Sequence, residues 1–323
     1  MTGINDNLMI SIIMTAILYG TPLVFAGIGE LFAERSGVLN LGVEGMMLIG
    51  AVLGFFVSQE MTGPSWVVLL VAVVVAMLGA AVMALIHAFV TITLRANQIV
   101  SGLTLTIFAG AIGLSSYIAA DNRLGAKAGK HQFNPLNLFG AKNLPVVGPI
   151  LFHQSAMVYL SWLLAVGAVI YLYRTRIGLH LRSVGESPQS ADAMGINVTK
   201  YRYLHVLLGG ALAGAGGAVF TLQIATNWID GMTAGAGWIA IALVIFSFWR
   251  PDLLLLGAYL FGAFTSIGFD LQARGITSIP SEFWSSLPYL MTVVALVAVS
   301  ASSVRRRLGT PAALGIPYVR EES

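Results

Sequence analysis

Apolar residues form long, nearly uninterrupted runs along this chain, separated by shorter polar segments. Windows of about 19 residues with near-continuous apolarity are typical of membrane-spanning helices. They predict nine spans, at residues 8–29, 41–58, 65–91, 99–120, 155–173, 203–225, 237–249, 253–269 and 287–304. The seventh span is short for a hydrocarbon layer of about 30 Å, and it is separated from the eighth by the break at 249–252. Since this pair could instead form a hairpin or a broken helix, the pattern predicts about nine spans, within a range of eight to ten.

One polar stretch, residues 174–202, lies between the fifth and sixth spans and predicts a short capped helix outside the bilayer. The Ser187 side chain can accept a hydrogen bond from a first-turn amide, and Pro188 suits the first helical position. Gly195 can then end the helix in the left-handed conformation. Residues 188–194 would form a rod about 10 Å long. A membrane protein that builds such a helix between basic flanks is expected to dock against something on that side.

The predicted helix also presents a surface that suits a partner protein. Ala191 and Met194 are three residues apart and therefore share a helical face, and a small apolar face can enter a groove on a partner. Arg182 and Glu186 can pair with charges at the rim of that groove. The alternative is an ordinary interfacial helix without a partner.

The composition restricts the class of protein. Hydrophobic residues make up 57% of the chain and charged residues only 10%, which predicts an all-α, polytopic transmembrane helical bundle. The 36 glycines fit helices that pack closely in lipid. Nucleic-acid binding has no support, because the formal net charge is +3 and the basic residues are spread over several loops.

The sequence also lacks the patterns of several kinds of chemistry. It has no cysteine, and its five histidines are scattered without metal-ligand spacing. No nucleophile–base arrangement or phosphate-binding loop is present. We therefore expect no cofactor in this chain, and we expect that it does not hydrolyse ATP.

The basic residues predict the orientation of the spans. Cytoplasmic loops are enriched in Lys and Arg, so we expect four basic sites on the cytoplasmic side: Arg95, the stretch 174–202, Arg250 and the run 305–307. The external side then holds the N-terminus and the loop 121–154, although this loop also carries Arg123, Lys127, Lys130 and Lys142. No soluble segment is long enough to fold alone. The prediction is one transmembrane domain, residues 1–323, with a cytoplasmic loop at 175–202 and an external loop at 121–154.

Glu44 lies near the start of the second apolar run. A carboxylate within the membrane costs about 3 kcal/mol on insertion scales, so it should face protein or a water-filled cavity. Glu44 is therefore a candidate for the substrate pathway or for a hinge. The alternative is a carboxylate that accepts hydrogen bonds from backbone amides around Gly42 and Gly45.

Neutral polar side chains at or near the span ends are further candidates for the pathway. They are Asn40, Asn97, Gln98, Gln223 and Asn227. They suit a polar, uncharged solute better than an ion, because no span carries a matched set of charges. The alternative for each is an interhelical hydrogen bond.

Two glycine-rich breaks echo each other in the two halves of the chain. LNLGVEGMMLIGA in the first half and GMTAGAGWIAIALV in the second each run into an apolar helix. Paired interruptions of this kind favour a central transport pathway.

Three segments, in this order, carry a family resemblance: ERSGVLNLGVEGMMLIGA (34–51), GLHLRSVGESPQSADAMGI (178–196) and GMTAGAGWIAIALVIFSFWRP (231–251). The chain resembles, over nearly its whole length, the inner-membrane permeases of ABC importers for simple sugars, nucleosides and branched-chain amino acids. The short N-terminus and NLGVEGMM look most like the nucleoside or simple-sugar branch. Branched-chain amino-acid permeases usually have a histidine and an acidic residue where Val43 and Glu44 stand, which counts against that substrate.

The resemblance implies an importer in the bacterial inner membrane with several partners. Two permeases, identical or homologous, would enclose the pathway, two ATPase subunits would bind ATP and drive it from the cytoplasm, and an external binding protein or lipoprotein would deliver the solute. The stretch 182–195 would carry the coupling helix, with Gly185, Glu186, Pro188, Ala191 and Gly195 matching the family pattern. Gln189 and Ser190 depart from it on the exposed face. The residues expected to couple to the ATPase are Arg182, Gly185, Glu186, Ser187, Pro188, Ala191, Met194 and Gly195.

Two other classes of function remain open at this point. A secondary transporter driven by protons or sodium would need a titrating or ion-binding carboxylate in the membrane, and Glu44 is the one good candidate. A membrane enzyme or a structural scaffold would need clustered polar catalytic groups, and no such cluster is visible in the sequence.

Overall fold

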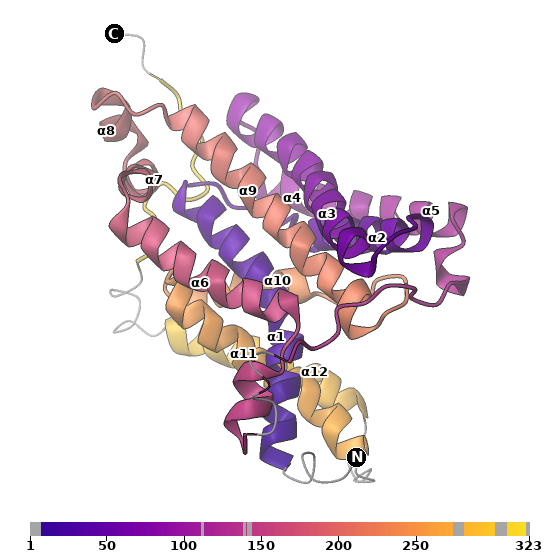
Figure 1. Ribbon diagram of the computed structural model, residues 1–323. Coiled ribbons are helices and arrows are strands. Elements are labelled where there is room, and N and C mark those ends of the chain that lie inside the picture. The colour runs from indigo at the N-terminus through magenta and orange to yellow at the C-terminus, as the bar shows by residue number, and fades with distance from the viewer. Residues whose placement is uncertain are drawn as a thin grey trace.

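The computed structural model describes residues 8–110, 113–137, 140, 144–273, 281–300 and 309–320 (Figure 1). All regular structure in these residues is helical, as predicted. The α-helices are α1 (Leu8–Arg35), α2 (Val43–Glu60), α3 (Ser65–Ala88), α4 (Gln98–Ala109), α5 (Leu114–Asp121), α6 (Ala156–Arg174), α7 (Arg176–Glu186), α8 (Pro188–Ala193), α9 (Val198–Val219), α10 (Ala236–Phe246), α11 (Pro251–Ala273) and α12 (Ser281–Ser300). Short π-helical turns extend α3 (Phe89–Thr93) and α9 (Phe220–Ile224).

Six helices in the described residues are long and apolar enough to cross a membrane. They are Met9–Arg35, Val43–Glu60, Ser65–Thr93, Gln98–Asp121, Ala156–Arg174 and Val198–Ile224. The predicted count of about nine spans is not confirmed. The seventh predicted span contains only the 11-residue helix α10, which rises about 16 Å, roughly half of the hydrocarbon layer.

The basic sites predicted for one side gather at one end of the bundle. Arg250 lies near the end of α1, because Arg35 at that end donates to the carbonyl of the preceding residue, Trp249, at 3.1 Å. Arg35 also donates to the carbonyl of Gly309 at 3.1 Å. Thr93, two residues before Arg95, bonds the Tyr203 hydroxyl near the start of α9. Figure 1 places α7 and α8 at this end as well. The run 305–307 lies outside the described residues, and the assignment of this end to the cytoplasm stays a prediction.

The loop 121–154 lies at the opposite end. Lys130 donates to the carbonyl of Gln59 at 2.6 Å, and Lys127 pairs with Glu60 at 2.5 Å. The amide of Gly129 donates to the carbonyl of Thr226 after α9. Two of the lysines that oppose the orientation rule are therefore held by the ends of neighbouring segments.

Helix α9 is the central element, because it packs against α1, α2 and α3. Its sequence GGALAGAGGA removes side chains where other backbones approach. A Cβ atom on Gly217 would lie 1.9 Å from the carbonyl oxygen of Met47, and one on Gly214 would lie 2.4 Å from that of Ala76. Only glycine fits such contacts, as expected for helices that associate in lipid.

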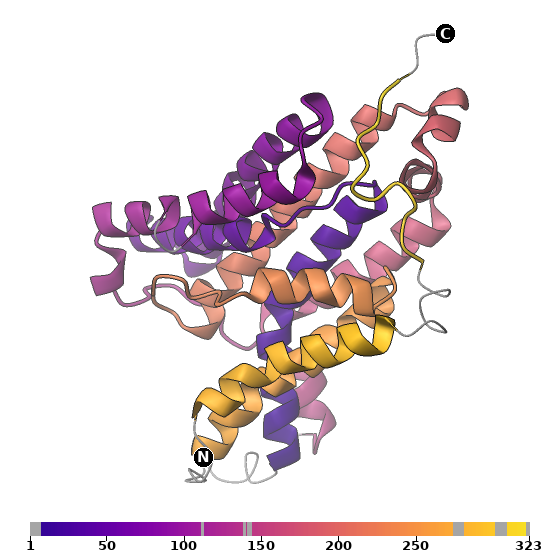
Figure 2. The ribbon, with the colours of Figure 1, turned by 180° about the vertical axis from the view of Figure 1, so that it is seen from behind.

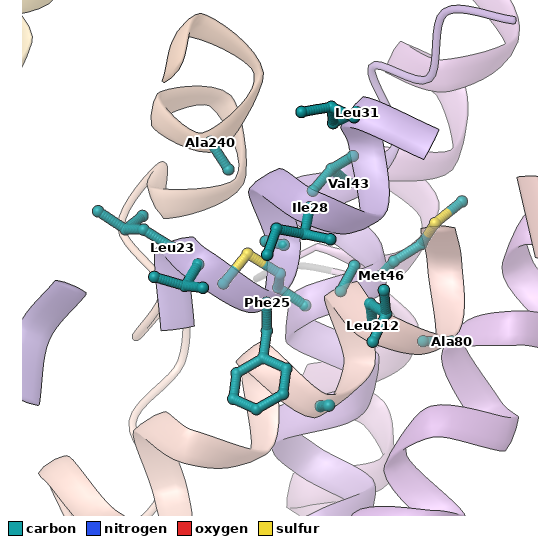
Figure 3. Packing of buried hydrophobic residues seen from close by; sticks show 14 of the residues in the cluster. Leu23, Phe25, Ile28, Leu31, Val43, Met46, Ala80, Leu212 and Ala240 are labelled. Carbon is teal, nitrogen blue, oxygen red and sulfur yellow. The ribbon is translucent and has the colours of Figure 1, made fainter. Parts of the chain in front are cut away.

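The main hydrophobic core lies where α1, α2, α3, α9 and α10 meet (Figure 3). Phe25 and Ile28 of α1, Met46 of α2 and Leu212 of α9 are at most 6% exposed. Seen from behind, α10, α11 and α12 cover one side of α1 (Figure 2). This core fixes the start of α2 against the start of α10, where Glu44 lies.

Candidate functional site

The coupling segment, residues 175–197, has the predicted capped helix. The Ser187 Oγ accepts from the Ser190 amide at 3.3 Å, and Pro188 occupies the first position of α8. Gly195 has φ +80°, its amide donates to Asp192, and the Ile196 amide donates back to Ala191. These bonds form a left-handed C-terminal cap, which only glycine adopts without strain.

The expected face of Ala191 and Met194 needs a correction. Ala191 is 3% exposed and packs inward against Val184 and Val198, whereas Met194 is 82% exposed. The short helix buries one face against its own chain, and Ala191 lies on that face. Of the two residues, only Met194 projects outward. Whether Met194 contacts a partner stays a prediction.

The residues that precede α8 have mixed environments. The Arg182 guanidinium lies over the Tyr173 ring, 5.3 Å from its centroid, so it is partly held within the chain. Glu186 is exposed, as a rim residue would be. Gly185 is buried, and a Cβ there would lie 2.3 Å from the Arg35 carbonyl oxygen. Two open grooves flank α8: one of about 770 Å³ lined by Met194 and Tyr201, and one of about 530 Å³ lined by Asp192 and Lys200.

Glu44 joins the two glycine-rich breaks. Its carboxylate accepts from the Thr233 hydroxyl at 2.6 Å and from the amides of Gly235 and Gly237 at 2.8 and 2.6 Å. The carboxylate is therefore bound by backbone amides, but those of 235–237 and not those around Gly42 and Gly45. It lies at the N-termini of both α2 and α10, where the helix dipoles favour a negative charge.

The fit between these two helix starts leaves no space. A Cβ on Gly237 would lie 2.5 Å from both the Cα and the amide nitrogen of Glu44. Glu44 itself is 6% exposed. The arrangement can hold α2 and α10 together within the membrane.

Two of the neutral candidates bond to the 36–42 loop, which leads into this contact: Asn40 lies within the loop, and Gln98 reaches it from the start of α4. Asn40 is fully buried. Its backbone amide donates to the Glu30 carboxylate at 2.9 Å, and its side-chain oxygen accepts from the backbone amide of Gly42 at 3.0 Å. Gln98 accepts from the Leu39 amide at 2.7 Å, while its Nε2 is buried without a partner in the described residues. Both side chains therefore shape the loop that leads into α2.

The other neutral candidates are not part of one cluster. Asn97 caps α4 by accepting from Val100 at 3.1 Å. Gln223 accepts from the Ser155 hydroxyl at 2.7 Å, near the opposite end of the bundle, and Asn227 follows it in the irregular segment before α10. The structure thus unites Asn40, Gln98 and Glu44 around the start of α2 and leaves Gln223 and Asn227 apart.

Sequence reasoning missed a buried polar group near the end of α1. Glu30 and Glu34 are each 1% exposed, and one oxygen of each has no hydrogen-bond partner in the described part of the chain. Glu34 accepts from the indole of Trp249 at 2.5 Å. Trp249 is itself 2% exposed, so this hydrogen bond is shielded from solvent. The spacing of the two acids, four residues on a helix, was the available signal.

A family model described as "Branched-chain amino acid transport system / permease component" matches residues 12–296. The chain belongs to this permease family. It is 41% identical to a putative glucose ABC transporter permease of Haloferax volcanii, which covers 93% of this chain and 95% of the relative. It is 37% identical to the nucleoside ABC transporter permease NupC of Lactococcus lactis, over 96% of this chain and 97% of the relative. The guanosine permease NupQ of Bacillus subtilis is 36% identical, over 97% and 98%.

The permease is a multi-pass inner-membrane subunit of an ABC importer, as the resemblance implied. It is not itself an enzyme, since separate ATPase subunits hydrolyse ATP in such transporters, which also have substrate-binding partners. This family membership decides against the alternative of an ion-driven secondary transporter.

Proposed function

We propose that this permease carries a nucleoside across the membrane and that α8 couples it to an ATPase subunit. The substrate class is supported by two relatives named for nucleoside or guanosine transport, which align over nearly the full chain. A simple sugar is the close alternative, because the Haloferax relative is named for glucose.

The capped helix α8 is the observation that carries the coupling role. It stands outside the long apolar helices and is fixed at both ends by its own caps. The side chain of its C-cap residue Met194 is exposed, as is that of Glu186 at the end of α7. A helix held this firmly can transmit a push without bending at its ends.

The proposed assembly has two permeases, this chain and a homologue or a second copy, with two ATPase subunits and an external binding protein. ATP belongs to the ATPase subunits, and this chain needs no cofactor. In this proposal the irregular segment 225–235 and the half-length α10 make one crossing together, and α11 and α12 make two more. With the six long helices this gives nine crossings and puts α8 in the cytoplasm.

The mechanism is alternating access driven by movement of α8. Closure of the ATPase subunits would displace α7 and α8 as a rigid piece, and α7 bears on the end of α1 through Gly185. Helix α1 lines the joint between α2 and α10, where Glu44 holds two helix starts together. Opening or sliding at that joint would change access to the pathway.

Co-purification and uptake test the proposal. The full transporter should retain the ATPase subunits and a second permease on this chain, and its binding protein should prefer nucleosides to glucose in a direct binding titration. Proteoliposomes should take up the preferred solute only when ATP is present on the side of the membrane that carries the ATPase subunits. A chain that purifies without any ATPase, or uptake that survives ATP depletion, would contradict the proposed function.

A further inference from the structure

The C-terminal segment 309–320 lies against the coupling segment and was not assigned any role by the sequence. Terminal segments are usually poorly ordered unless other elements tie them down. This one is tied at five points along its length: to α1, to the loop after α1, to α7, to α9 and to α8. Figure 2 shows it running beside the ends of α1 and α7.

Its middle part fixes α7. The Ala313 amide donates to the Gly185 carbonyl at 2.9 Å, and the Ala313 side chain is 6% exposed. On its other side, Gly185 meets the Arg35 carbonyl so closely that no Cβ fits. The C-terminal segment therefore clamps α7 onto the end of α1.

Two buried guanidinium groups close the clamp. Arg202 of α9, which is 1% exposed, donates from Nε to the Ser36 carbonyl at 3.2 Å and from Nη1 to the Ile316 carbonyl at 3.1 Å. Arg35 donates from Nη1 to the Gly309 carbonyl at 3.1 Å. Hydrogen bonds from a charged donor are about twice as strong as neutral ones. Three segments far apart in the sequence thus share two buried cations.

The last part of the segment reaches α8 itself. Tyr318 packs on the small cluster of Val184, Ala191 and Val198, on the inward face of α8. Arg320 pairs with Asp192 at 3.1 Å. The inward face that Ala191 offers is therefore covered in part by the chain's own C-terminus.

We propose that residues 309–320 form a C-terminal brace that positions the coupling helix and makes α7, α8, the end of α1 and the start of α9 move as one body. The inference rests on the coupling role proposed for α8. Without the brace, displacement of α8 would be absorbed at the α7–α1 contact, so that ATP would be hydrolysed with little transport. Arg202, Ala313 and Gly185 are positioning residues in this account.

Ala313→Pro tests the brace in the complete transporter in proteoliposomes, because it removes the amide that the Gly185 carbonyl accepts. The matched control is Ala312→Pro: Ala312 is exposed, donates no described backbone bond, and occupies the second position of the turn closed by Leu314 and Pro311, which proline favours. We expect Ala313→Pro to retain the ATPase subunits and to hydrolyse ATP within about twofold of wild type, while uptake per ATP falls about tenfold. The control should keep wild-type coupling.

Uptake per ATP within about twofold of wild type in Ala313→Pro would overturn the brace. Loss of the bound ATPase subunits in that variant would also overturn it, since the segment would then dock the partner and not position α8. If wild-type protein itself fails to bind ATPase subunits, the proposed function fails instead, which separates the two claims.

A second measurement tests the brace without Ala313→Pro, in case that variant does not fold. The chain has no cysteine, so Ala312→Cys with Ala193→Cys provides two exposed sites for spin labels in an otherwise native transporter. The distance between brace and α8 should change by less than about 2 Å between the nucleotide-free and ATP-trapped states. A larger change would show that they move separately and would refute the brace.

Discussion

The contact around Glu44 and the coupling segment are built on opposite plans. Glu44 is buried, and its two oxygens accept three hydrogen bonds from the 233–237 segment. The coupling segment buries Ala191 but leaves Met194 82% exposed and Glu186 open. The first region satisfies its polar groups within the chain, whereas the second keeps side chains free for another protein. In the proposed mechanism the interior contact is a joint and the outer helix is the surface that receives the ATPase subunit.

The largest expected effect comes from breaking the joint with Gly237→Val. Its Cβ would meet the backbone of Glu44 at 2.5 Å, and overpacking costs about 3 kcal/mol or more when backbone must move. We expect a much lower yield of monodisperse protein, a lower Tm and no uptake. Gly167→Val is the matched control, because nothing lies within 4 Å of a Cβ at that helical glycine; it should purify like wild type. Wild-type Tm for Gly237→Val would contradict the account of the joint.

Glu44→Ala should have the next largest effect. It leaves the Thr233 hydroxyl and two amides buried without an acceptor, at a cost of about 2–3 kcal/mol. We expect both Tm and uptake to fall. For Glu44→Gln we expect a Tm and an uptake rate between those of Glu44→Ala and wild type. The glutamine oxygen can still accept hydrogen bonds, whereas its NH2 group would meet a donor where the second carboxylate oxygen now accepts. Equal, wild-type-like behaviour of the two variants would show that the carboxylate does not hold α2 to α10.

Gly195→Val sharpens the comparison, because it should affect function and spare the fold. A β-branched residue at φ +80° is strained by about 1–2 kcal/mol, but nothing lies within 4 Å of a Cβ there. We expect an unchanged Tm of the bundle and uptake reduced about tenfold. Gly140→Val is the control, because Gly140 also has a positive φ (+66°) and nothing within 4 Å of a Cβ, but lies in the 121–154 loop at the opposite end; it should transport normally. Wild-type uptake by Gly195→Val would count strongly against the coupling role.

The smallest effect is expected from Arg320→Ala. Its side chain is 77% exposed and its ion pair with Asp192 is on the surface, and such pairs contribute at most about 1 kcal/mol. Uptake should stay within about twofold of wild type. A severe loss would mean that the ion pair, and not the buried part of the brace, positions α8.

Local signals were sufficient where the structure is local. The caps of α8 follow from Ser187, Pro188 and Gly195, which act within a few residues of one another. The all-helical class follows from the apolar runs. The count of about nine spans is not confirmed, and the seventh run, which is already short in the sequence, contains the half-length α10.

Contacts between distant segments could not be derived in the same way. One interpretation of the sequence had Glu44 accept hydrogen bonds from backbone amides around Gly42 and Gly45. The amides that donate are those of Gly235 and Gly237, which only the fold brings close to Glu44. The echo between the two glycine-rich breaks was the one hint of that contact. The same holds for Trp249, which tertiary packing buries against Glu34 although the two residues are far apart in the sequence.

Site-specific crosslinking at Met194 tests the central claim most directly. In this cysteine-free chain, Met194→Cys provides a single thiol on α8, and Trp66→Cys provides a similarly exposed one (72% against 82%) at the opposite end of the bundle. With a short bifunctional reagent in the intact transporter, the account predicts a covalent adduct with the ATPase subunit from position 194 and none from position 66. An ATPase adduct from position 66, or its absence from position 194 while the ATPase stays bound, would contradict the account.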